Sequence, residues 1–360
     1  MSNRFVAFDE IIADHTRYAK KIPKEHYLLM GKYPIIDQGQ EYIAGYSNDR
    51  HGIFNEVPAI IFGDHTRILK YIDFPFFLGA DGVKLLKNRN KNVECKYLYY
   101  CLLNSRIPNT GYNRHFKWLK EIQIMICPIE KQKKIIDILD KAKSLIDLRK
   151  KQIEKMDLLI KSKFIEMFGD PVTNPKKWRV VTFAEVATID THMTTDWEKY
   201  NGLPHIGIEN IEKDTGHITK LKLVRDSELI SGKYIFDKRH IIYSKIRPNL
   251  NKVALPDFTG VCSADAYPIL PKSNTTRYYL AFILRSQHFL DYILSHSDRT
   301  NIPKVNKKQL AGFELPLPPV EDQNSFTLFV DSVEEQKYML QHGLHKMEIN
   351  YKSLMQEYFG

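Results

Sequence analysis

The chain repeats itself, and this repeat limits its fold more than any other feature of the sequence. Residues 164–169 read FIEMFG, and the last six residues, 355–360, read MQEYFG. At the same offset of 191 residues, apolar positions before each ending coincide: Leu119, Ile122, Ile124, Ile126 and Pro128 match Leu310, Phe313, Leu315, Leu317 and Pro319. Two copies of roughly 170 to 180 residues are too long for a solenoid repeat and suit one domain plus an appendage.

The segment before each ending has the pattern of a coiled-coil helix. Apolar residues recur there at alternating steps of four and three, over more than four heptads. Each helix is expected to be about 55 Å long at ~1.5 Å per residue. The first seam consists of Ile135, Leu139, Ala142, Ile146, Arg149, Ile153, Met156, Ile160, Lys163 and Met167, and the second of Phe326, Val330, Val333, Lys337, Leu340, Leu344, Met347, Tyr351, Leu354 and Tyr358.

The charge distribution indicates that the two helices pair with each other. Residues 131–169 carry a net charge of +5 and residues 322–360 carry −3, out of a total of +10. Tandem copies related by a pseudo-twofold axis would place these helices antiparallel, which buries both seams within one chain. In the alternative interpretation, each seam packs only against its own globular block. Gly343 in the second helix costs roughly 1 kcal/mol relative to Ala and predicts a bend or a close approach.

The two larger blocks are predicted to be α+β domains. Strand patterns such as VPAIIFG at 57–63 and GFELPLPPV at 312–320 alternate with helical patterns such as KYLYYCLLNS at 96–105. The predicted organisation is a first domain at 1–130, a first long helix at 131–169, a second domain at 170–321 and a second long helix at 322–360. The two domains are expected to be related by a pseudo-twofold axis, with the helices paired as an antiparallel coiled coil.

Composition places the chain among cytoplasmic proteins. No stretch approaches eighteen consecutive apolar residues, and the start MSNRFVAFDE lacks the layout of a signal peptide. The four cysteines have no CxxC spacing and lie in or next to apolar runs, so they are predicted to be reduced structural residues.

The sequence contains no recognised motif for catalysis or metal binding. No glycine-rich loop has the spacing of a phosphate-binding or dinucleotide-binding site, and the thirteen histidines form no HExxH set. The sequence 174–177 reads NPKK and not the Asn-Pro-Pro-aromatic loop that holds a flipped adenine. Asp64 and Asp81 are interpreted as turn or cap residues. The sequence therefore predicts no catalytic residue, no metal site and no cofactor on this chain.

Polar and basic residues gather in loops between apolar strands, at corresponding places in both copies. Arg, Lys, Asn and Gln carry the donor patterns that match phosphates and the edges of guanine and adenine, so these loops are predicted to bind double-stranded DNA. For any single residue, a solvated loop remains an alternative. The predicted DNA-binding residues are Gln38, Gln40, His65, Arg67, Lys70, Asn113, Arg114 and Lys117 in the first copy, and Lys245, Arg247, Asn249, Asn251, Arg299, Asn301 and Lys304 in the second.

The junction MFGDPVTNPKKW at 167–178, the stretch at 60–86 and the endings LPLPPVEDQ and IMICPIEKQKKI resemble the specificity subunit of Type I restriction-modification systems. The resemblance covers essentially the whole chain. It implies two target recognition domains, each reading half of a bipartite asymmetric DNA target, with the helices setting the gap and docking two modification subunits. Those subunits bind S-adenosylmethionine, and restriction subunits, where present, use ATP and Mg²⁺. The resemblance implies none of these activities on this chain, and no membrane contact.

Two other functions remain open from the sequence. The chain could be a self-contained DNA-modifying or DNA-cleaving enzyme whose site carries no known motif. Alternatively, the seams could be the homodimerisation surfaces of a scaffold protein.

Overall fold

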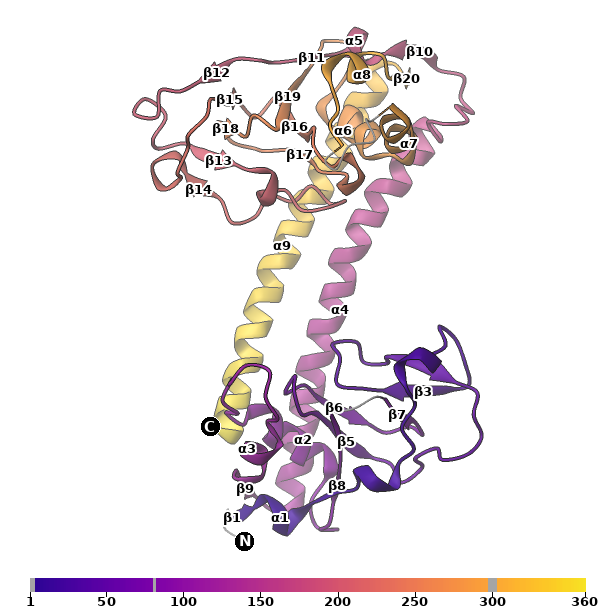
Figure 1. Ribbon diagram of the computed structural model, residues 1–360, viewed down its shortest axis with the longest axis vertical. Coiled ribbons are helices and arrows are strands. Elements are labelled where there is room, and N and C mark those ends of the chain that lie inside the picture. Colours follow the sequence, from indigo (N-terminus) through magenta and orange to yellow (C-terminus); the bar gives the residue numbers. More distant parts are fainter. Residues whose placement is uncertain (1–3, 80–81, 297–302) are drawn as a thin grey trace. The chain divides into compact units, whose positions relative to one another are not determined.

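A computed structural model describes residues 4–79, 82–296 and 303–360 and is shown in Figure 1. The chain divides into two compact units. Unit 1 contains Met1–Lys151 and Gln341–Gly360, and unit 2 contains Gln152–Leu340. Each unit therefore holds one globular domain together with a part of both long helices.

The domain of unit 1 combines short strands with three short α-helices, and it is followed by the first long helix. Its elements are β1 (Arg4–Ala7), α1 (Phe8–Ile11), β2 (Ile12–Asp14), η1 (Thr16–Tyr18), η2 (Lys24–His26), β3 (Tyr33–Ile36), β4 (Gly45–Ser47), β5 (Ala59–Gly63), β6 (Leu69–Ile72), β7 (Phe77–Leu78), β8 (Val83–Asn88), α2 (Cys95–Asn104), α3 (Phe116–Lys120), β9 (Gln123–Ile126) and α4 (Ile129–Phe168).

The domain of unit 2 follows the same plan with additional elements. These elements are β10 (Arg179–Thr182), α5 (Phe183–Val186), β11 (Ala187–Ile189), β12 (Met193–Thr194), β13 (Pro204–Ile206), η3 (Ile208–Asn210), β14 (Lys222–Leu223), η4 (Val224–Asp226), β15 (Lys233–Phe236), β16 (Ile241–Ser244), η5 (Pro248–Leu250), β17 (Val253–Ala254), β18 (Gly260–Cys262), β19 (Ala266–Pro271), α6 (Arg277–Arg285), α7 (Gln287–His296), α8 (Lys307–Ala311), β20 (Glu314–Leu317) and α9 (Val320–Phe359).

The sheets of the two units correspond strand for strand. The pair β1-β9 matches β10-β20, and the sheet β2-β8-β5-β6 matches β11-β19-β16-β17. The sheet β4-β3-β7 matches the part β14-β13-β18 of the five-stranded sheet in unit 2, and in both the central strand runs parallel to one neighbour. The predicted α+β fold with two tandem copies is confirmed. The second domain has two further strands, β12 and β15, in its five-stranded sheet, and a further helix, α7.

The two long helices have the predicted pattern of burial. Each contains 40 residues, and every seam residue named above is buried or half-buried. In unit 1 the start of α4 packs beside the end of α9, and in unit 2 the end of α4 packs beside the start of α9. This is the predicted antiparallel pairing (Figure 1). Helix α9 continues through Gly343, where a Cβ would lie 2.6 Å from Nη1 of Arg149, so the glycine marks a close approach.

Ion pairs between the helices are few. In unit 1, Lys150 Nζ lies 2.9 Å from Glu348 Oε1, and in unit 2 the buried Lys337 contacts Asp157. In the second pair the acid lies on the basic helix and the base on the acidic one, which is the reverse of the expected sense. Both partners of the Lys150–Glu348 pair are exposed, so that pair contributes at most about 1 kcal/mol. Asp157 compensates the charge of the buried Lys337. The apolar seam is therefore the main source of helix pairing.

Each long helix contributes residues from both of its ends to a domain core. Ile135 and Leu139 of α4 and Met355 of α9 belong to the core that contains α2 in unit 1. Phe164 of α4 and Phe326 of α9 belong to the core that contains α6 in unit 2. The alternative in which each seam packs only against its own domain is wrong, because the end of α9 is part of the first unit's core.

A buried glutamine joins the start of each long helix to its domain. In unit 1, Gln132 Oε1 accepts from Glu94 N at 2.9 Å, and its Nε2 donates to Cys127 O at 2.7 Å. In unit 2, Gln323 Oε1 accepts from Thr276 N at 2.8 Å, and its Nε2 donates to Pro318 O at 2.9 Å. Both side chains are 0% exposed. Since Glu94 and Thr276 precede α2 and α6, each glutamine fixes a long helix against the helix of its domain core.

Candidate nucleic-acid interface

Three loops come together at one end of the sheets in each unit. Loop A is 37–41 in unit 1 and 207–211 in unit 2, and it follows β3 or β13. Loop B is 64–68 and 245–252, and it follows β5 or β16. Loop C is 107–115 and 303–306, and it precedes α3 or α8. These loops contain most of the residues predicted to bind DNA.

Loops B and C are held together in the same way in both units. In unit 1 the backbone N–H of His115 donates to Asp64 O at 2.8 Å, and in unit 2 the N–H of Val305 donates to Lys245 O at 2.8 Å. Asp64 and Lys245 are the first residues of loop B after matched strands. The backbone contact between loops B and C is therefore the same in both units, whereas the side chains at these positions differ.

Loop A is anchored by a lysine in each unit. Lys70 Nζ donates to Asp37 O at 2.9 Å and also to Glu41 O, and its side chain is only 4% exposed. In unit 2, Lys252 Nζ donates to Ile208 O at 2.8 Å. Burial lowers the pKa of Lys70, against the opposing effect of Asp37. Lys70 was predicted to contact DNA, but here its ammonium group bonds within the domain and positions loop A.

The side chains of loops A and B contact each other in unit 1. The N–H of His65 donates to Gln38 Oε1 at 3.2 Å, and the His65 ring stacks on Tyr112 of loop C, with centroids 4.6 Å apart and planes 8° from parallel. Tyr112 is 87% exposed, so the stacked pair faces solvent. A Cβ at Gly82, where φ is +81°, would lie 2.6 Å from Gln38 Nε2, which leaves room only for glycine.

Asp64 has the structural role that the sequence indicated. It is 4% exposed, and its Oδ1 accepts from the N–H of Phe116 at 2.8 Å, at the first residue of α3. A carboxylate at a helix N-terminus satisfies a backbone donor that lacks a partner within the helix. Asp81, interpreted in the same way, lies outside the described residues.

Loops B and C form a cluster of lysines in unit 2. Residue Ile246 pairs with Lys304 in an isolated β-bridge, and the N–H of Arg247 donates to Pro303 O at 3.0 Å. Burial lowers the pKa of Lys245, and the positive charges of Lys304 and Lys307 lower it further, while Asp265 opposes them. The charges of Lys304 and Lys307 disfavour the protonated form of Lys245, and a bound anion such as a DNA phosphate would stabilise that form.

Loop B is strained in both units. Arg67 in unit 1 has φ +62°, and in unit 2 Arg247 and Asn251 have φ +48° and +47° on either side of the turn η5. Side chains with a Cβ rarely occupy this left-handed region, and such residues are found where surrounding contacts enforce them, often at functional sites. Strain at the same loop of both copies supports a functional role.

A hollow of about 510 Å³ lies beside loop A of unit 2. It is lined by His205, Glu209 and Asn210 together with Lys220 and Lys222. The Nε2 atom of His205 is buried there with no hydrogen-bond partner among the described residues. Burial lowers the pKa of His205, Lys233 lowers it further, and Glu209 opposes both. The imidazole is therefore held neutral, with one nitrogen available to a ligand.

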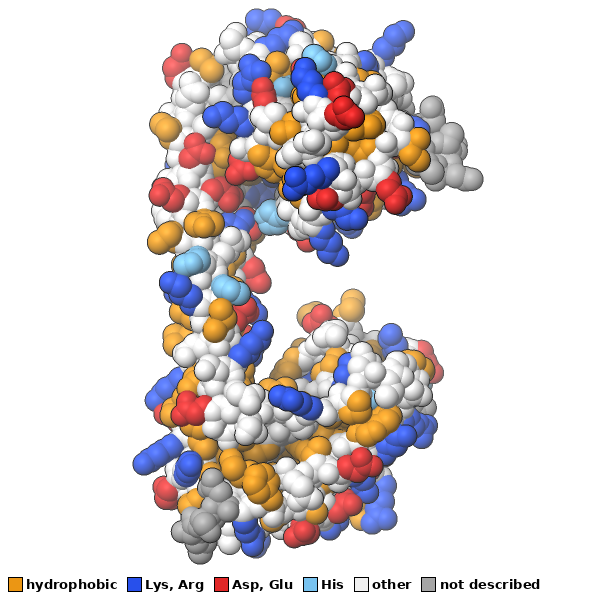
Figure 2. Space-filling view, turned by 90° about the vertical axis from the view of Figure 1, so that its left-hand side faces the viewer, with side chains coloured by type: hydrophobic (Ala, Val, Ile, Leu, Met, Phe, Trp, Pro, Cys, Tyr) orange, Lys and Arg blue, Asp and Glu red, His pale blue; other side chains and the backbone are white. Residues whose placement is uncertain are grey.

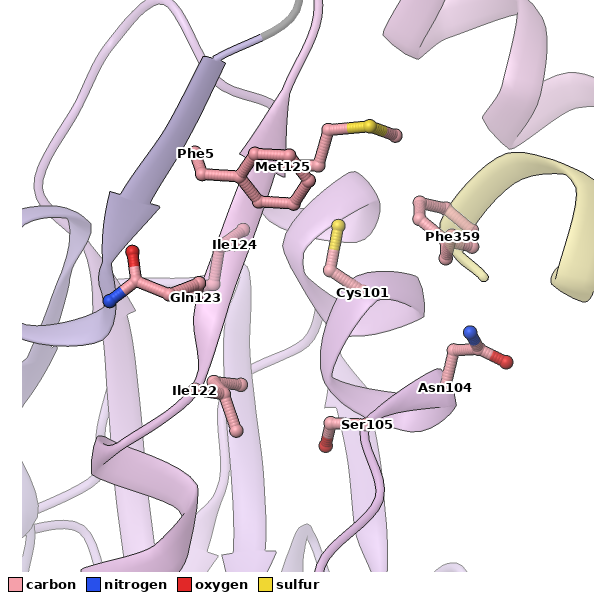
Figure 3. Close-up of a pocket in the computed structure, with 9 residues that line it drawn as sticks. All are labelled: Phe5, Cys101, Asn104, Ser105, Ile122, Gln123, Ile124, Met125 and Phe359. Carbon is pink, nitrogen blue, oxygen red and sulfur yellow. The ribbon is translucent and has the colours of Figure 1, made fainter.

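A second, smaller hollow of about 90 Å³ lies in unit 1 between β9, the end of α2 and the end of α9 (Figure 3). The sulfur of Cys101 lies between the rings of Phe5 and Phe359 in this view. Burial raises the pKa of the Cys101 thiol, so it stays protonated and is a poor nucleophile. All four cysteines are free, as predicted.

The predicted DNA-binding residues differ in exposure. Gln40, Asn113, Arg114, Lys117, Arg247, Asn249 and Lys304 are exposed, whereas Gln38, His65, Arg67, Lys245 and Asn251 are half-buried and Lys70 is buried. Arg299 and Asn301 lie outside the described residues. The structure adds Lys307 and Glu209, which the sequence analysis missed. The position of Lys307, three residues after Lys304 and next to a helix cap, was the one available signal.

The comparison with known families agrees with this duplicated arrangement. The family model described as Type I restriction modification DNA specificity domain matches twice, at residues 12–157 and 175–347. The chain belongs to this family. As a Type I specificity subunit it recognises a DNA sequence, and the two matches coincide with the two copies of the repeat. The resemblance inferred from the sequence is confirmed, and nothing found in the comparisons supports the alternative of a self-contained enzyme.

Relatives and solved structures are similar over different shares of the chain. The EcoDI specificity subunit of Escherichia coli is 32% identical over 45% of this chain, and the match spans only 37% of that relative. The EcoR124I/EcoR124II specificity subunit of Escherichia coli is 25% identical over 91% of this chain and 85% of that relative. The crystal structure of a Type I S subunit from M. genitalium has a TM-score of 0.62 at 14% identity, covering 100% of this chain and 96% of that one.

A chain from a structure concerned with assembly and conformational transition of the type I R-M system has a TM-score of 0.55 at 17% identity, and covers 99% of this specificity subunit. At these identities the structural likeness establishes the fold. The named relatives are specificity subunits, not modification or restriction subunits. Within residues 4–79, 82–296 and 303–360, no group of His, Cys, Asp and Glu side chains could hold a metal ion, and no helix is long and apolar enough to cross a membrane.

Proposed function

We propose that each domain of this specificity subunit reads one half of a bipartite, asymmetric target in double-stranded DNA through loops A, B and C. The observation that carries the proposal is the repeated loop B to loop C contact, which presents different side chains from the same backbone position in the two units. A repeated scaffold with different side chains would give two half-sites of different sequence.

The two domains offer different chemistry to DNA. In unit 2, Lys245, Lys304 and Lys307 would bind phosphates, because lysine is a flexible point charge with three donors. In unit 1, Gln38 and the exposed Asn113 and Arg114 carry amide and guanidinium groups that can bond two atoms of one base edge. Phosphate contacts fix the register, whereas contacts with base edges set the sequence.

The two long helices are proposed to set the gap between the half-sites. Each is a continuous helix of 40 residues that takes part in both units, so it is about 60 Å long at ~1.5 Å per residue. Deleting seven residues from both helices, at 149–155 and 341–347, removes ~10.5 Å of helix. The recognised gap should shorten by about three base pairs at ~3.4 Å each. An unchanged gap with retained DNA binding would refute this role.

Matched apolar residues on the helix surface point to two identical partners. Leu148 and Met339 are related by the repeat and are 58% and 65% exposed, and the related pair Leu158 and Ile349 is 61% and 54% exposed. Each unit contains one member of each pair. Figure 2 shows such hydrophobic side chains exposed on the surface of the long helices, among charged ones. We propose that these surfaces dock two modification subunits, with restriction subunits joining the complex where the system has them.

The chain itself is proposed to be non-catalytic and to act in the cytoplasm, with S-adenosylmethionine, ATP and Mg²⁺ used by its partners. Methylome sequencing of cells that express it with its modification subunits tests the proposed function. We expect methyladenine in a motif of two dissimilar halves separated by a fixed gap. A continuous motif, or none, would contradict this proposal.

Two measurements separate the alternatives. The purified chain, incubated with DNA, Mg²⁺ and S-adenosylmethionine, is expected to give neither cleavage nor methyl transfer, and either activity would favour the enzyme alternative. Light scattering of the purified chain is expected to give the mass of a monomer. A stable dimer in the absence of partners would favour the scaffold alternative instead.

A further inference from the structure

The conformation of loop B in unit 2 requires support from outside the loop. Arg247 and Asn251, both with positive φ, enclose the single turn Pro248–Leu250. Each residue held in this region is less stable by about 1 kcal/mol or more than in an ordinary conformation. The isolated loop would relax, so contacts from the rest of the domain must hold the shape that carries Arg247 and Asn249.

Loop C holds the start of loop B, and Arg285, the last residue of α6, holds its end. Its Nε and Nη2 donate to Val253 O at 3.1 and 2.7 Å, directly after loop B. In return, its backbone oxygen accepts from Asn251 Nδ2 at 3.1 Å. The guanidinium group is tightly enclosed, because a Cβ on Gly216 would lie 2.5 Å from Arg285 Nη2 and 1.8 Å from Val253 O. One arginine thus fixes both the side chain of Asn251 and the backbone that follows it.

Acidic residues of both long helices balance the charge of this half-buried arginine. Burial lowers the pKa of Arg285 to about 10, while Glu334 of α9 and Asp157 of α4 raise it, and the nearby Arg277 lowers it. Arg285 therefore remains charged at neutral pH. Charged hydrogen bonds are about twice as strong as neutral ones, and in a water-poor setting they hold geometry well. The loop is thereby linked to the pair of long helices.

Unit 1 has no equivalent of this arrangement. The buried tyrosines Tyr97 and Tyr279 occupy matched positions in α2 and α6, since both hydroxyls donate to carbonyl groups of matched strands, Met125 O of β9 and Pro316 O of β20. Counting from them, the position of Arg285 in α2 is Leu103, which is 41% exposed. Loop B of unit 1 is held instead through Asp64.

We propose that Arg285 is a positioning residue that holds loop B of unit 2 in the conformation that reads the second half of the DNA target. The inference rests on the proposed function, because it assumes that loop B contacts DNA. It assigns sequence discrimination in one half-site to a residue that does not itself touch DNA. Recognition of the other half-site does not depend on Arg285.

The substitution Arg285→Lys tests this proposal within the complete chain, co-expressed with its modification subunits. Lysine keeps the charge near Glu334 and Asp157 but cannot donate from two nitrogens to Val253 O. Methylation is measured at the wild-type target and at sites with one changed base in either half. We expect discrimination in the half-site read by unit 2 to fall roughly tenfold, the size of a typical single-base preference, while discrimination in the other half stays unchanged.

Arg277→Lys is the matched control. Arg277 begins the same helix and also donates to backbone oxygens, His240 O at 3.0 Å and Pro256 O at 2.6 Å, but it makes no contact with loop B. This variant should retain the wild-type motif. Equal losses in both variants, or an R285K motif identical to wild type, would overturn the proposal. A wild-type chain that gives no bipartite motif would instead refute the proposed function.

A second variant covers the case in which R285K fails to accumulate. Asn251→Gly removes the loop's bond to Arg285 O, and glycine adopts a positive φ without strain. It should relax discrimination in the same half-site, while the purified protein still unfolds cooperatively. A normal motif in N251G together with a misfolded R285K would show that Arg285 serves stability alone.

Discussion

In unit 1 the first residue of loop B is Asp64, and in unit 2 it is Lys245. Both carbonyl oxygens accept the same backbone hydrogen bond from loop C, yet the carboxylate of Asp64 caps α3, whereas the ammonium group of Lys245 belongs to a cluster of lysines. The difference shows that duplication has preserved the backbone that positions the loops, while their charge and hydrogen bonding have diverged. Two half-sites of unlike sequence need this combination.

The largest expected difference between the units concerns the repeated ending of the chain. Phe168, at the first ending, is 3% exposed and packs against Tyr279 and Phe326, with ring centroids 5.0 and 5.4 Å away. Its counterpart Phe359 is half-buried and packs against Tyr97 at 5.4 Å. Phe168→Ala should lower the free energy of unfolding by about 4 kcal/mol and Phe359→Ala by about half as much, measured by chemical denaturation. Equal losses would show that the two ends are packed alike.

The buried glutamines should differ less. Gln132→Met and Gln323→Met keep the volume of the side chain but leave a backbone N–H and a carbonyl without partners in each unit, and Gln323→Met also leaves the hydroxyl of Thr275 without its partner. Each substitution should lower the free energy of unfolding by about 2 kcal/mol. Denaturation of the two variants side by side is the measurement. A clear inequality would mean that one joint is supported by contacts that the other lacks.

The lysine cluster should make DNA binding by unit 2 sensitive to salt. Lys304→Ala and Lys307→Ala should weaken binding uniformly across sequences, and each should reduce the slope of log affinity against log salt concentration by ~1 if it removes one phosphate contact. Titrations of target DNA at several salt concentrations, with the assembled methyltransferase, provide the slope. Lys308→Ala is the control, because Lys308 follows in the same helix but does not influence Lys245. An equal change in the control would assign the effect to net charge.

The smallest expected effect is a dependence of stability on mildly acidic pH that arises from His205 in unit 2. His205 of β13 occupies the position of Ile35 in β3, since the two strands pair with β18 and β7 in the same parallel register. Burial lowers the pKa of His205 below its ordinary value of 6.5. The unfolded chain therefore binds the proton more readily, and stability is lost as the pH falls below 6.5.

The substitution His205→Ile copies the residue of unit 1 and should remove this acid sensitivity. Melting temperatures of the wild type and the variant, measured at pH 7.5 and pH 5.5, give the comparison. The wild type should lose more stability than the variant on acidification. A loss of the same size in both proteins would place the responsible group elsewhere in the chain.

Much of the fold could be predicted because it follows from the local periodicity of the sequence. Apolar residues spaced alternately by four and three, beginning at Ile135 and Phe326, define the two long helices and their buried seams. The duplicated endings locate the two copies. Short strands such as β14 and β17 leave too little pattern to be found. Each has only two residues, too few to show the alternation of a strand.

The candidate site was less predictable because its geometry is set by tertiary contacts. Lys70 has the composition of a DNA contact, and only the fold shows that loop A closes over its ammonium group. Arg285 lies in an apolar helix with no polar motif around it, and its link to loop B crosses more than thirty residues of sequence. Periodicity locates the loops along the chain but not the side chains that support them.

The glutamine joints have a consequence for how this chain can change in length. Gln132 and Gln323 bond each long helix to the domain that precedes it, and this resists rotation of that domain about the helix axis. One residue added to such a helix would turn everything beyond it by ~100° about the axis. Tolerated insertions should therefore be those that return loops A, B and C to their original orientation about the helix axis. Among relatives, the gap between the two halves of the DNA target should then change in discrete steps.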